Sequence, residues 1–271
     1  MPMLQGMKAL ATALCLALAG PVSAMTQDDV LSATFLPGWR MENGNHMAAL
    51  SLALSPGWKT YWRAPGEAGI PPVFDWSGSS NIRSVRWHWP SPSVFHSNGL
   101  QTVGYHDGLV LPVEITPVDP AAPVTVKLRV DLGVCKDICM PAALSFEGTL
   151  PAGSGAPDAA IRAALRDRPQ AGAEAGLRDI TCTVEPIADG LRLTARIDLP
   201  PAAADEVVVF ETANPGVWVS EAMTGRQGGV LVSTADLVPP GKGGFALDRR
   251  GVTVTVLGKG RAIEISGCPA P

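Results

Sequence analysis

Residues 47–62 read MAALSLALSPGWKTYW. The apolar run Met47 to Leu54 ends at Ser55-Pro56-Gly57, where Pro and Gly favour the backbone angles of a tight turn. A second short run, Trp58 to Trp62, follows at once and is rich in aromatic residues. The stretch therefore predicts a strand, a tight turn and a second strand.

Similar short runs recur on both sides of this stretch and set the expected fold class. Between residues 151 and 175 the composition changes to Ala, Gly, Pro, Asp and Arg, and Ala159 to Leu165 predicts one short helix. We expect a mainly β protein in which a sandwich over 28–150 is joined by a linker with one helix, over 151–175, to a second sandwich over 176–271. The further predicted strands are Val85 to Trp89, Leu109 to Ile115, Val124 to Leu132, Ile180 to Val184, Leu191 to Leu199, Glu206 to Glu211, Val230 to Ser233, Val252 to Leu257 and Ala262 to Ile265.

The composition supports this fold class and excludes some partners. The chain of 271 residues has 29 Gly and 25 Pro but only 17% charged residues, which suits short strands joined by turns. Its net charge of −4 is spread without basic clusters, so nothing indicates binding to nucleic acid or to an anionic membrane surface.

The N-terminus has the features of a secretory signal peptide over residues 1–24. Lys8 precedes an apolar run from Ala9 to Ala19, and Val22-Ser23-Ala24 suits cleavage before Met25. No later apolar stretch is long enough to span a membrane. We therefore expect export to the periplasm, with four of the five cysteines left in the mature chain.

Cys135 and Cys139 are separated by Lys136-Asp137-Ile138 and follow a predicted strand. On one extended strand they would lie about 13 Å apart, beyond the reach of a disulfide, so they can bond only across a tight turn or one helical turn. Closing so short a loop adds little stability, which favours thiol–disulfide exchange over a structural bridge. A structural clip and a metal site remain alternatives, and the sequence does not show which cysteine attacks.

Cys182 and Cys268 lie near the two ends of the predicted second sandwich. A bridge between them would close a long loop, which stabilises a domain by about 4 kcal/mol in the chain-entropy model. Nothing around either residue suggests reactivity. We expect this pair to be a structural disulfide.

Aromatic residues concentrate just after the first predicted turn, and two interpretations are open. They could form a binding surface for sugar or peptide, but aromatic side chains usually fill sandwich cores, and we favour packing. The four histidines show no metal-ligand spacing and are expected to be surface or hydrogen-bonded residues. The aromatic residues are Trp58, Tyr61, Trp62, Trp76, Trp87 and Trp89, and the histidines are His46, His88, His96 and His106.

Several motifs together resemble the N-terminal periplasmic domain of the thiol:disulfide interchange protein DsbD, particularly its ScsB-type relatives. The resemblance is good over residues 28–150. The matching residues are Pro56-Gly57-Trp58-Lys59-Thr60-Tyr61-Trp62, Pro65-Gly66, Gly69-Ile70-Pro71-Pro72, Asp75-Trp76-Ser77-Gly78, Trp89-Pro90, Gly104-Tyr105, Leu111-Pro112-Val113 and Val134-Cys135-Lys136-Asp137-Ile138-Cys139-Met140-Pro141.

The resemblance implies an immunoglobulin-like fold whose cysteine pair, Cys135 and Cys139, passes reducing equivalents to periplasmic proteins. In that family an aromatic loop caps the cysteines, and Phe95 with His96 occupies the corresponding place here. The resemblance also implies a membrane-embedded electron donor, which we expect to be a separate protein.

Two other functions use the same residues differently. Cys135, Cys139 and Met140 offer soft sulfur ligands and could form a copper(I) site, although we expect no cofactor for the exchange reaction itself. Alternatively, both disulfides are structural and the chain is an interaction module. In that case replacing Cys135 and Cys139 with Ser would leave partner binding intact.

Overall fold

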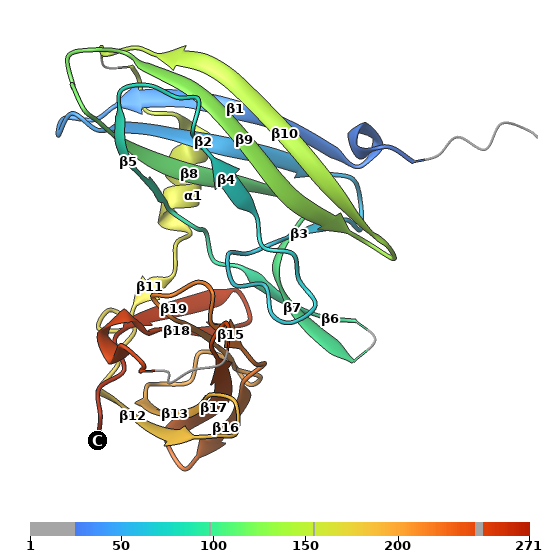
Figure 1. The fold of residues 1–271 in the computed structure, drawn as a ribbon, viewed down its shortest axis with the longest axis vertical. Helices are drawn as coiled ribbons and strands as arrows, with labels where there is room; N and C mark the ends of the chain where they lie inside the picture. Colours follow the sequence, from blue (N-terminus) through green and yellow to red (C-terminus); the bar gives the residue numbers. More distant parts are fainter. Residues whose placement is uncertain (1–24, 98, 154, 242–245) are drawn as a thin grey trace, which may run out of the picture.

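A computed structural model describes residues 25–97, 99–153, 155–241 and 246–271, and the predicted signal peptide lies outside this range. Within it, nearly all regular structure is β and the sheets form two pairs (Figure 1). The mainly β, sandwich-type fold expected from the sequence is therefore confirmed. None of the described helices is long and apolar enough to cross a membrane.

The first sheet pair encloses the largest of the three hydrophobic clusters among the described residues. One sheet has the strand order β1-β2-β8-β5, and the other has the order β10-β9-β3-β7-β6 with β4 also paired to β9. The strands are β1 (Leu31–Arg40), β2 (His46–Leu54), β3 (Lys59–Tyr61), β4 (Val73–Asp75), β5 (Ile82–Trp87), β6 (Ser93–Ser97), β7 (Leu100–His106), β8 (Gly108–Pro117), β9 (Val124–Cys135) and β10 (Cys139–Leu150); a 3-10 turn, η1 (Gln27–Asp29), precedes them.

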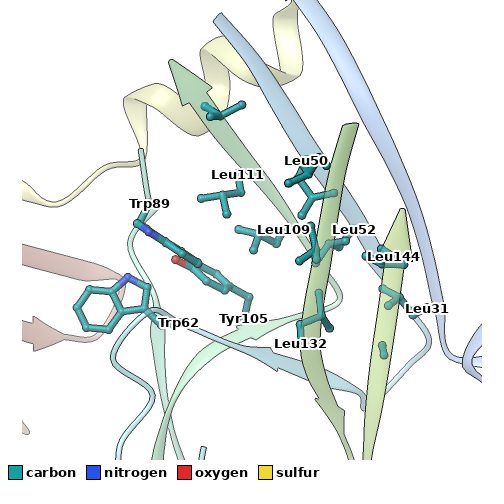
Figure 2. Close-up of a cluster of buried hydrophobic side chains, with 14 of the residues drawn as sticks. Leu31, Leu50, Leu52, Trp62, Trp89, Tyr105, Leu109, Leu111, Leu132 and Leu144 are labelled. Atoms are coloured by element: carbon teal, nitrogen blue, oxygen red, sulfur yellow. The ribbon is translucent and has the colours of Figure 1, made fainter. Parts of the chain in front are cut away.

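Apolar side chains from both sheets meet in this core (Figure 2). Leu50 and Leu111, from β2 and β8, are each 1% exposed, and Leu132 of β9 belongs to the same core. Each large apolar side chain removed from water in this way contributes about 1.5–3 kcal/mol of transfer free energy, which holds the two sheets together.

Strand β9 has one face buried in the core and one face that carries exposed residues. Its even-numbered residues from Val124 to Val134 are buried in the core, whereas Lys127, Arg129 and Asp131 on the other face are exposed. Successive side chains of a strand point to opposite faces, so Cys135 lies on the outer face together with the charged residues.

The second sheet pair encloses a separate core and carries the other disulfide. Its sheets have the strand orders β11-β19-β18-β14 and β12-β13-β17-β15, with β16 also paired to β17. The strands are β11 (Gln170–Ala171), β12 (Asp179–Pro186), β13 (Leu191–Asp198), β14 (Val207–Glu211), β15 (Trp218–Val219), β16 (Met223–Gln227), β17 (Val230–Val238), β18 (Thr253–Gly258) and β19 (Arg261–Ser266), with a 3-10 turn η2 (Arg249–Gly251) before β18.

Helix α1 (Ala159–Arg166) connects the two sheet pairs and begins where the sequence predicts it. The Asp158 carboxylate accepts hydrogen bonds from the backbone N–H groups of Ala160 and Ile161, which caps the helix. Ile161 is fully buried against Met47 and Ala49 of β2. The helix therefore covers the outer face of the β1-β2-β8-β5 sheet.

An ion-pair cluster joins the two sheet pairs. Arg63, just after β3, donates to both carboxylate oxygens of Glu211 at 2.8 and 2.9 Å and to Glu264 at 2.6 Å. These contacts span 148 and 201 residues of sequence. The cluster is only partly exposed, so these charge-assisted bonds fix the second sheet pair beside the segment that follows β3.

Candidate redox site

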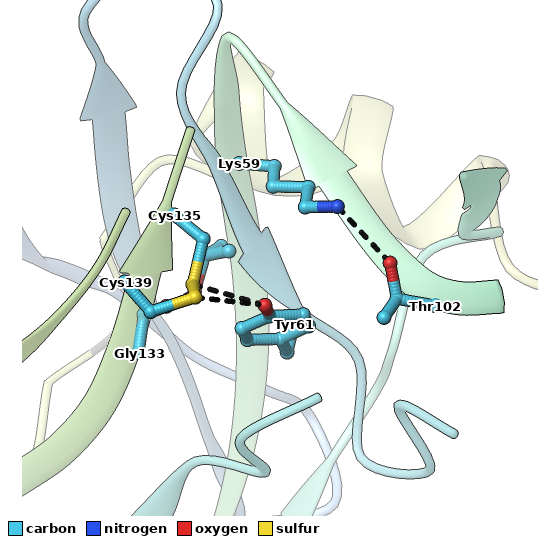
Figure 3. Close-up of a disulfide and its surroundings, with 7 residues drawn as sticks. Lys59, Tyr61, Thr102, Gly133, Cys135 and Cys139 are labelled. Atoms are coloured by element: carbon cyan, nitrogen blue, oxygen red, sulfur yellow. Dashed lines mark hydrogen bonds between the residues drawn. A yellow bond between two sulfur atoms is a disulfide. The ribbon is translucent and has the colours of Figure 1, made fainter. Parts of the chain in front are cut away.

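The two cysteines close a hairpin. Cys135 is the last residue of β9, Cys139 is the first of β10, and the two are partners in the antiparallel register. Lys136 N–H donates to the Ile138 carbonyl oxygen at 3.0 Å, which closes the turn. Of the two arrangements that the spacing allows, a tight turn and one helical turn, the structure has the tight turn. A disulfide joins the two residues, whose Cα atoms lie 4.1 Å apart (Figure 3).

The two cysteines differ sharply in exposure. Cys135 is only 1% exposed, whereas Cys139 is exposed and follows Ile138, which is 60% exposed at the tip of the turn. Attack on a disulfide sulfur requires access along the S–S bond. Cys139 is therefore the more accessible cysteine of the pair.

Tyr61 of β3 lies directly against the disulfide. Its hydroxyl group donates to Cys135 Sγ at 2.9 Å and lies 3.6 Å from Cys139 Sγ (Figure 3). Burial raises the pKa of Tyr61, so the group stays protonated and can donate to a sulfur that becomes negatively charged. The sequence-based interpretation treated Tyr61 as one more packing aromatic and missed this contact.

Successive side chains along β3 point to opposite faces of the sheet, and this alternation could have shown that Tyr61 lies on a different face from Trp58 and Trp62. Trp58, Thr60 and Trp62 are all buried, and both tryptophans belong to the first core. Lys59 and Tyr61 must then point to the other face, which is the face that carries the cysteines. The tryptophans confirm the packing interpretation, whereas Tyr61 does not.

Ile70 lies over Gly133, on the face of β9 that carries Cys135. Gly133 lies two residues before Cys135 on the same face, and its carbonyl oxygen accepts from Thr60 Oγ1 at 2.9 Å. A Cβ atom on Gly133 would lie 2.9 Å from the Ile70 Cβ atom, closer than carbon atoms can pack. Glycine at this position thus allows Ile70 to lie over the strand.

Phe95 and His96, the residues predicted to cap the cysteines, lie on a strand that is not adjacent to β9. The strand order β9-β3-β7-β6 places two strands between Cys135 and Phe95. Phe95 pairs with Thr102 of β7 and is half-buried, with the Lys59 ammonium group 5.1 Å from its ring centroid. His96 is exposed and, as the next residue of β6, points to the opposite face. A capping role for the two residues stays a prediction.

Met140, the third ligand of the alternative copper site, points away from the two cysteine sulfurs. It pairs with Val134 on the inner face of the sheet and packs against the first core. The residues that the structure describes contain no group of three or more His, Cys, Asp and Glu side chains suited to a metal. The copper(I) site thus stays a prediction that rests on the two thiols.

Cys182 and Cys268 form the second disulfide, far from the first in sequence and structure. Their Cα atoms lie 5.5 Å apart, and the residues are 0% and 1% exposed. Arg249 Nη1 donates to the carbonyl oxygens of Cys182 and Cys268 at 2.7 and 3.4 Å, which ties the turn before β18 to both ends of the second sheet pair. Such a buried bridge is shielded from exchange.

Two comparisons with known proteins find matches for this chain. Residues 31–151 match the family model described as "Thiol:disulfide interchange protein DsbD, N-terminal". A search of curated proteins finds no match. Among solved structures, the crystal structure of the N-terminal periplasmic domain of ScsB from Proteus mirabilis matches with a TM-score of 0.67 and 22% identity, over 91% of this chain and 96% of that one. Residues 31–151 therefore belong to the N-terminal domain family of the thiol:disulfide interchange protein DsbD.

Proposed function

We propose that this chain is a periplasmic carrier of reducing equivalents that works by thiol–disulfide exchange through Cys135 and Cys139. The observation that carries the proposal is the pairing of an exposed Cys139 with a buried Cys135 whose sulfur accepts a hydrogen bond from Tyr61. One sulfur is open to attack, and the other is held where it can accept the electron pair.

In the first half of the reaction the carrier is reduced. A thiolate of an electron donor attacks Cys139 Sγ, the bond between Cys139 and Cys135 breaks, and Cys135 leaves as a thiolate that accepts from the Tyr61 hydroxyl group. The donor's second thiolate then attacks the donor's first sulfur, which is bonded to Cys139, and Cys139 leaves as a thiolate. The donor leaves as a disulfide, and the carrier has gained two electrons and two protons.

In the second half the reduced carrier passes these electrons to a disulfide in another protein. The Cys139 thiolate attacks that disulfide and releases one of its sulfurs as a thiol. Cys135 then attacks Cys139 in the mixed disulfide, which restores the disulfide of the carrier and frees the second thiol. We propose that the donor is a membrane-embedded protein and the acceptors are periplasmic proteins, as the resemblance to the DsbD family implies.

The reduction potential of the Cys135–Cys139 pair tests this function. We expect the pair to equilibrate with thiol buffers between about −180 and −270 mV, the range of known exchange proteins, while Cys182 and Cys268 stay bonded. The measurement is mass spectrometry of alkylated cysteines after equilibration at defined potentials. A pair that resists reduction below about −300 mV would be a structural clip, and the carrier function would be wrong.

Replacing Tyr61 with Phe tests the leaving-group step. Without the hydroxyl group the departing Cys135 thiolate loses a hydrogen bond to a charged group, worth about 1.5 kcal/mol or more, so reduction by a small thiol at pH 7 should slow about tenfold. Tyr105→Phe is the matched control, because the Tyr105 hydroxyl group donates to Pro90 on the inner side of the sheet. Equal slowing in both variants would mean that lost stability, not the bond to sulfur, explains the effect.

A further inference from the structure

We propose that Lys59 couples the redox state of the cysteine pair to strands β6 and β7: its ammonium group holds Thr102 and Phe95 while the disulfide is intact and turns to the Cys135 thiolate when the pair is reduced. The inference rests on the proposed exchange function and adds a regulatory residue to the same site. Lys59 acts on the cysteine pair in one redox state and on β6 and β7 in the other.

Lys59 lies on β3 between β7 and β9, so its ammonium group can turn toward Thr102 and Phe95 or toward Cys135. On one side it is the register partner of Cys135 in β9, and on the other side it is the register partner of His106 in β7. Side chains of register partners lie on one face with Cβ atoms about 5 Å apart. A lysine has a flexible four-carbon stem, so its ammonium group can reach toward either neighbour by rotation alone.

With the disulfide intact, the ammonium group lies on the β7 side. Lys59 Nζ donates to Thr102 Oγ1 at 3.1 Å and lies over the Phe95 ring, pointing away from the two sulfurs (Figure 3). No carboxylate among the described residues forms an ion pair with it, and burial lowers the pKa of Lys59. The group therefore sits where a new anion would attract it strongly.

Reduction creates such an anion directly opposite Lys59. Cys135 is 1% exposed, so its thiolate depends on protein groups for stabilisation, and Tyr61 supplies one hydrogen bond. The other charged groups nearby lie on the turn or at the strand end: Lys136 Nζ donates to the Pro56 carbonyl oxygen at 3.3 Å, and Asp137 and His106 are exposed. Lys59 is the cation whose register position faces Cys135.

The ammonium group cannot serve both sites at once. When it pairs with the thiolate, Thr102 loses its donor and Phe95 loses the cation over its ring. Strand β6 is the edge strand of this sheet, so it depends on such contacts and on its pairing with β7. Reduction should thus loosen β6 and β7, and oxidation should tighten them.

Two variants with opposite expected effects test the coupling. Lys59→Met removes the charge that stabilises the thiolate, so at about pH 8.5, where an ordinary thiol is half ionised, the dithiol–disulfide equilibrium should shift about tenfold toward the disulfide, or about 30 mV. Thr102→Val removes only the contact of the oxidised state, so the equilibrium should shift about threefold toward the dithiol. The measurement is equilibration in thiol buffers followed by alkylation and mass spectrometry.

Matched controls separate this role from general effects of charge and stability. Lys136→Met removes a lysine that is adjacent to Cys135 in sequence but bonded to Pro56, and it should change the equilibrium less than threefold. Lys59→Arg keeps the charge and should restore most of the wild-type equilibrium. Hydrogen exchange of the β6 and β7 amides should be faster in the reduced wild type than in the oxidised one, and this difference should vanish in Lys59→Met.

The outcomes distinguish the coupling from the exchange function. A wild-type pair that exchanges normally while Lys59→Met and Thr102→Val shift the equilibrium in the same direction would overturn the role of Lys59 and leave the carrier function standing. If Lys136→Met shifted the dithiol–disulfide equilibrium as much as Lys59→Met does, this result would also overturn the role of Lys59 and leave the carrier function standing. A wild-type pair that resists reduction would overturn both.

Discussion

Replacing Cys135 with Ser should let this protein accumulate as a mixed disulfide, whereas replacing Cys139 with Ser should nearly abolish its reaction. In the first variant the exposed Cys139 still attacks, but no second thiol remains to release the product. In the second variant the remaining thiol is 1% exposed and lies beneath Tyr61. We expect its reaction to be slower by about a hundredfold or more, because thiol exchange depends on access.

Oxidised glutathione is a suitable probe for this prediction, with the adduct counted by mass spectrometry. The Cys135→Ser protein should retain one glutathione, and the wild type should pass through this adduct without accumulating it. In denaturant the two single variants should react at the same rate, since burial no longer distinguishes the cysteines. Faster reaction of the folded Cys139→Ser protein than of Cys135→Ser would reverse the assigned roles.

Removing the Cys182–Cys268 bridge should have the largest effect on stability. The two cysteines are 86 residues apart in sequence, and opening a loop of that length costs about 4.5 kcal/mol in the chain-entropy model. Both residues are almost fully buried in the second core, so their replacement also disturbs packing. The double variant Cys182→Ala with Cys268→Ala should therefore unfold its second sheet pair at much lower denaturant concentration or temperature.

The matched comparison is the double variant Cys135→Ala with Cys139→Ala. Its bridge spans a sequence separation of 4, for which the same model gives only about 2 kcal/mol. Calorimetry and denaturant titration of both double variants measure the difference. Equal losses of stability would show that loop length does not govern the two bridges, and a larger loss from the short bridge would make it the structural one.

Pattern and spacing predicted much of the fold because these features act locally. The Pro and Gly after Leu54 mark a turn, and the alternation in residues 191–199 and 252–257 fits strands that the structure contains as β13 and β18. The helix was predicted over Ala159–Leu165 and is observed one residue longer. Asp158, the capping residue, is a local signal of its start.

Other strands escaped prediction because their sequences alternate poorly. Pro37 and Gly38 interrupt β1, and its pairing with β2 is irregular between Leu36 and Trp39. Strand β10 has many exposed residues, and its pairing with β9 over its whole length maintains it. The two-residue strand β11 lies within the segment predicted as a linker and pairs in parallel with β19, near the other end of the chain.

The sequence by itself limited a bond between Cys135 and Cys139 to a tight turn or one helical turn, because a separation of four residues allows few geometries, and the structure has the tight turn. Only the tertiary structure decided which of them is buried and what surrounds it. Tyr61 lies 74 residues from Cys135 in sequence, and Lys59 faces that cysteine only through strand register. Strand pairing and the choice of the core face are long-range, so no local pattern could place a hydroxyl group and an ammonium group beside the reactive sulfur.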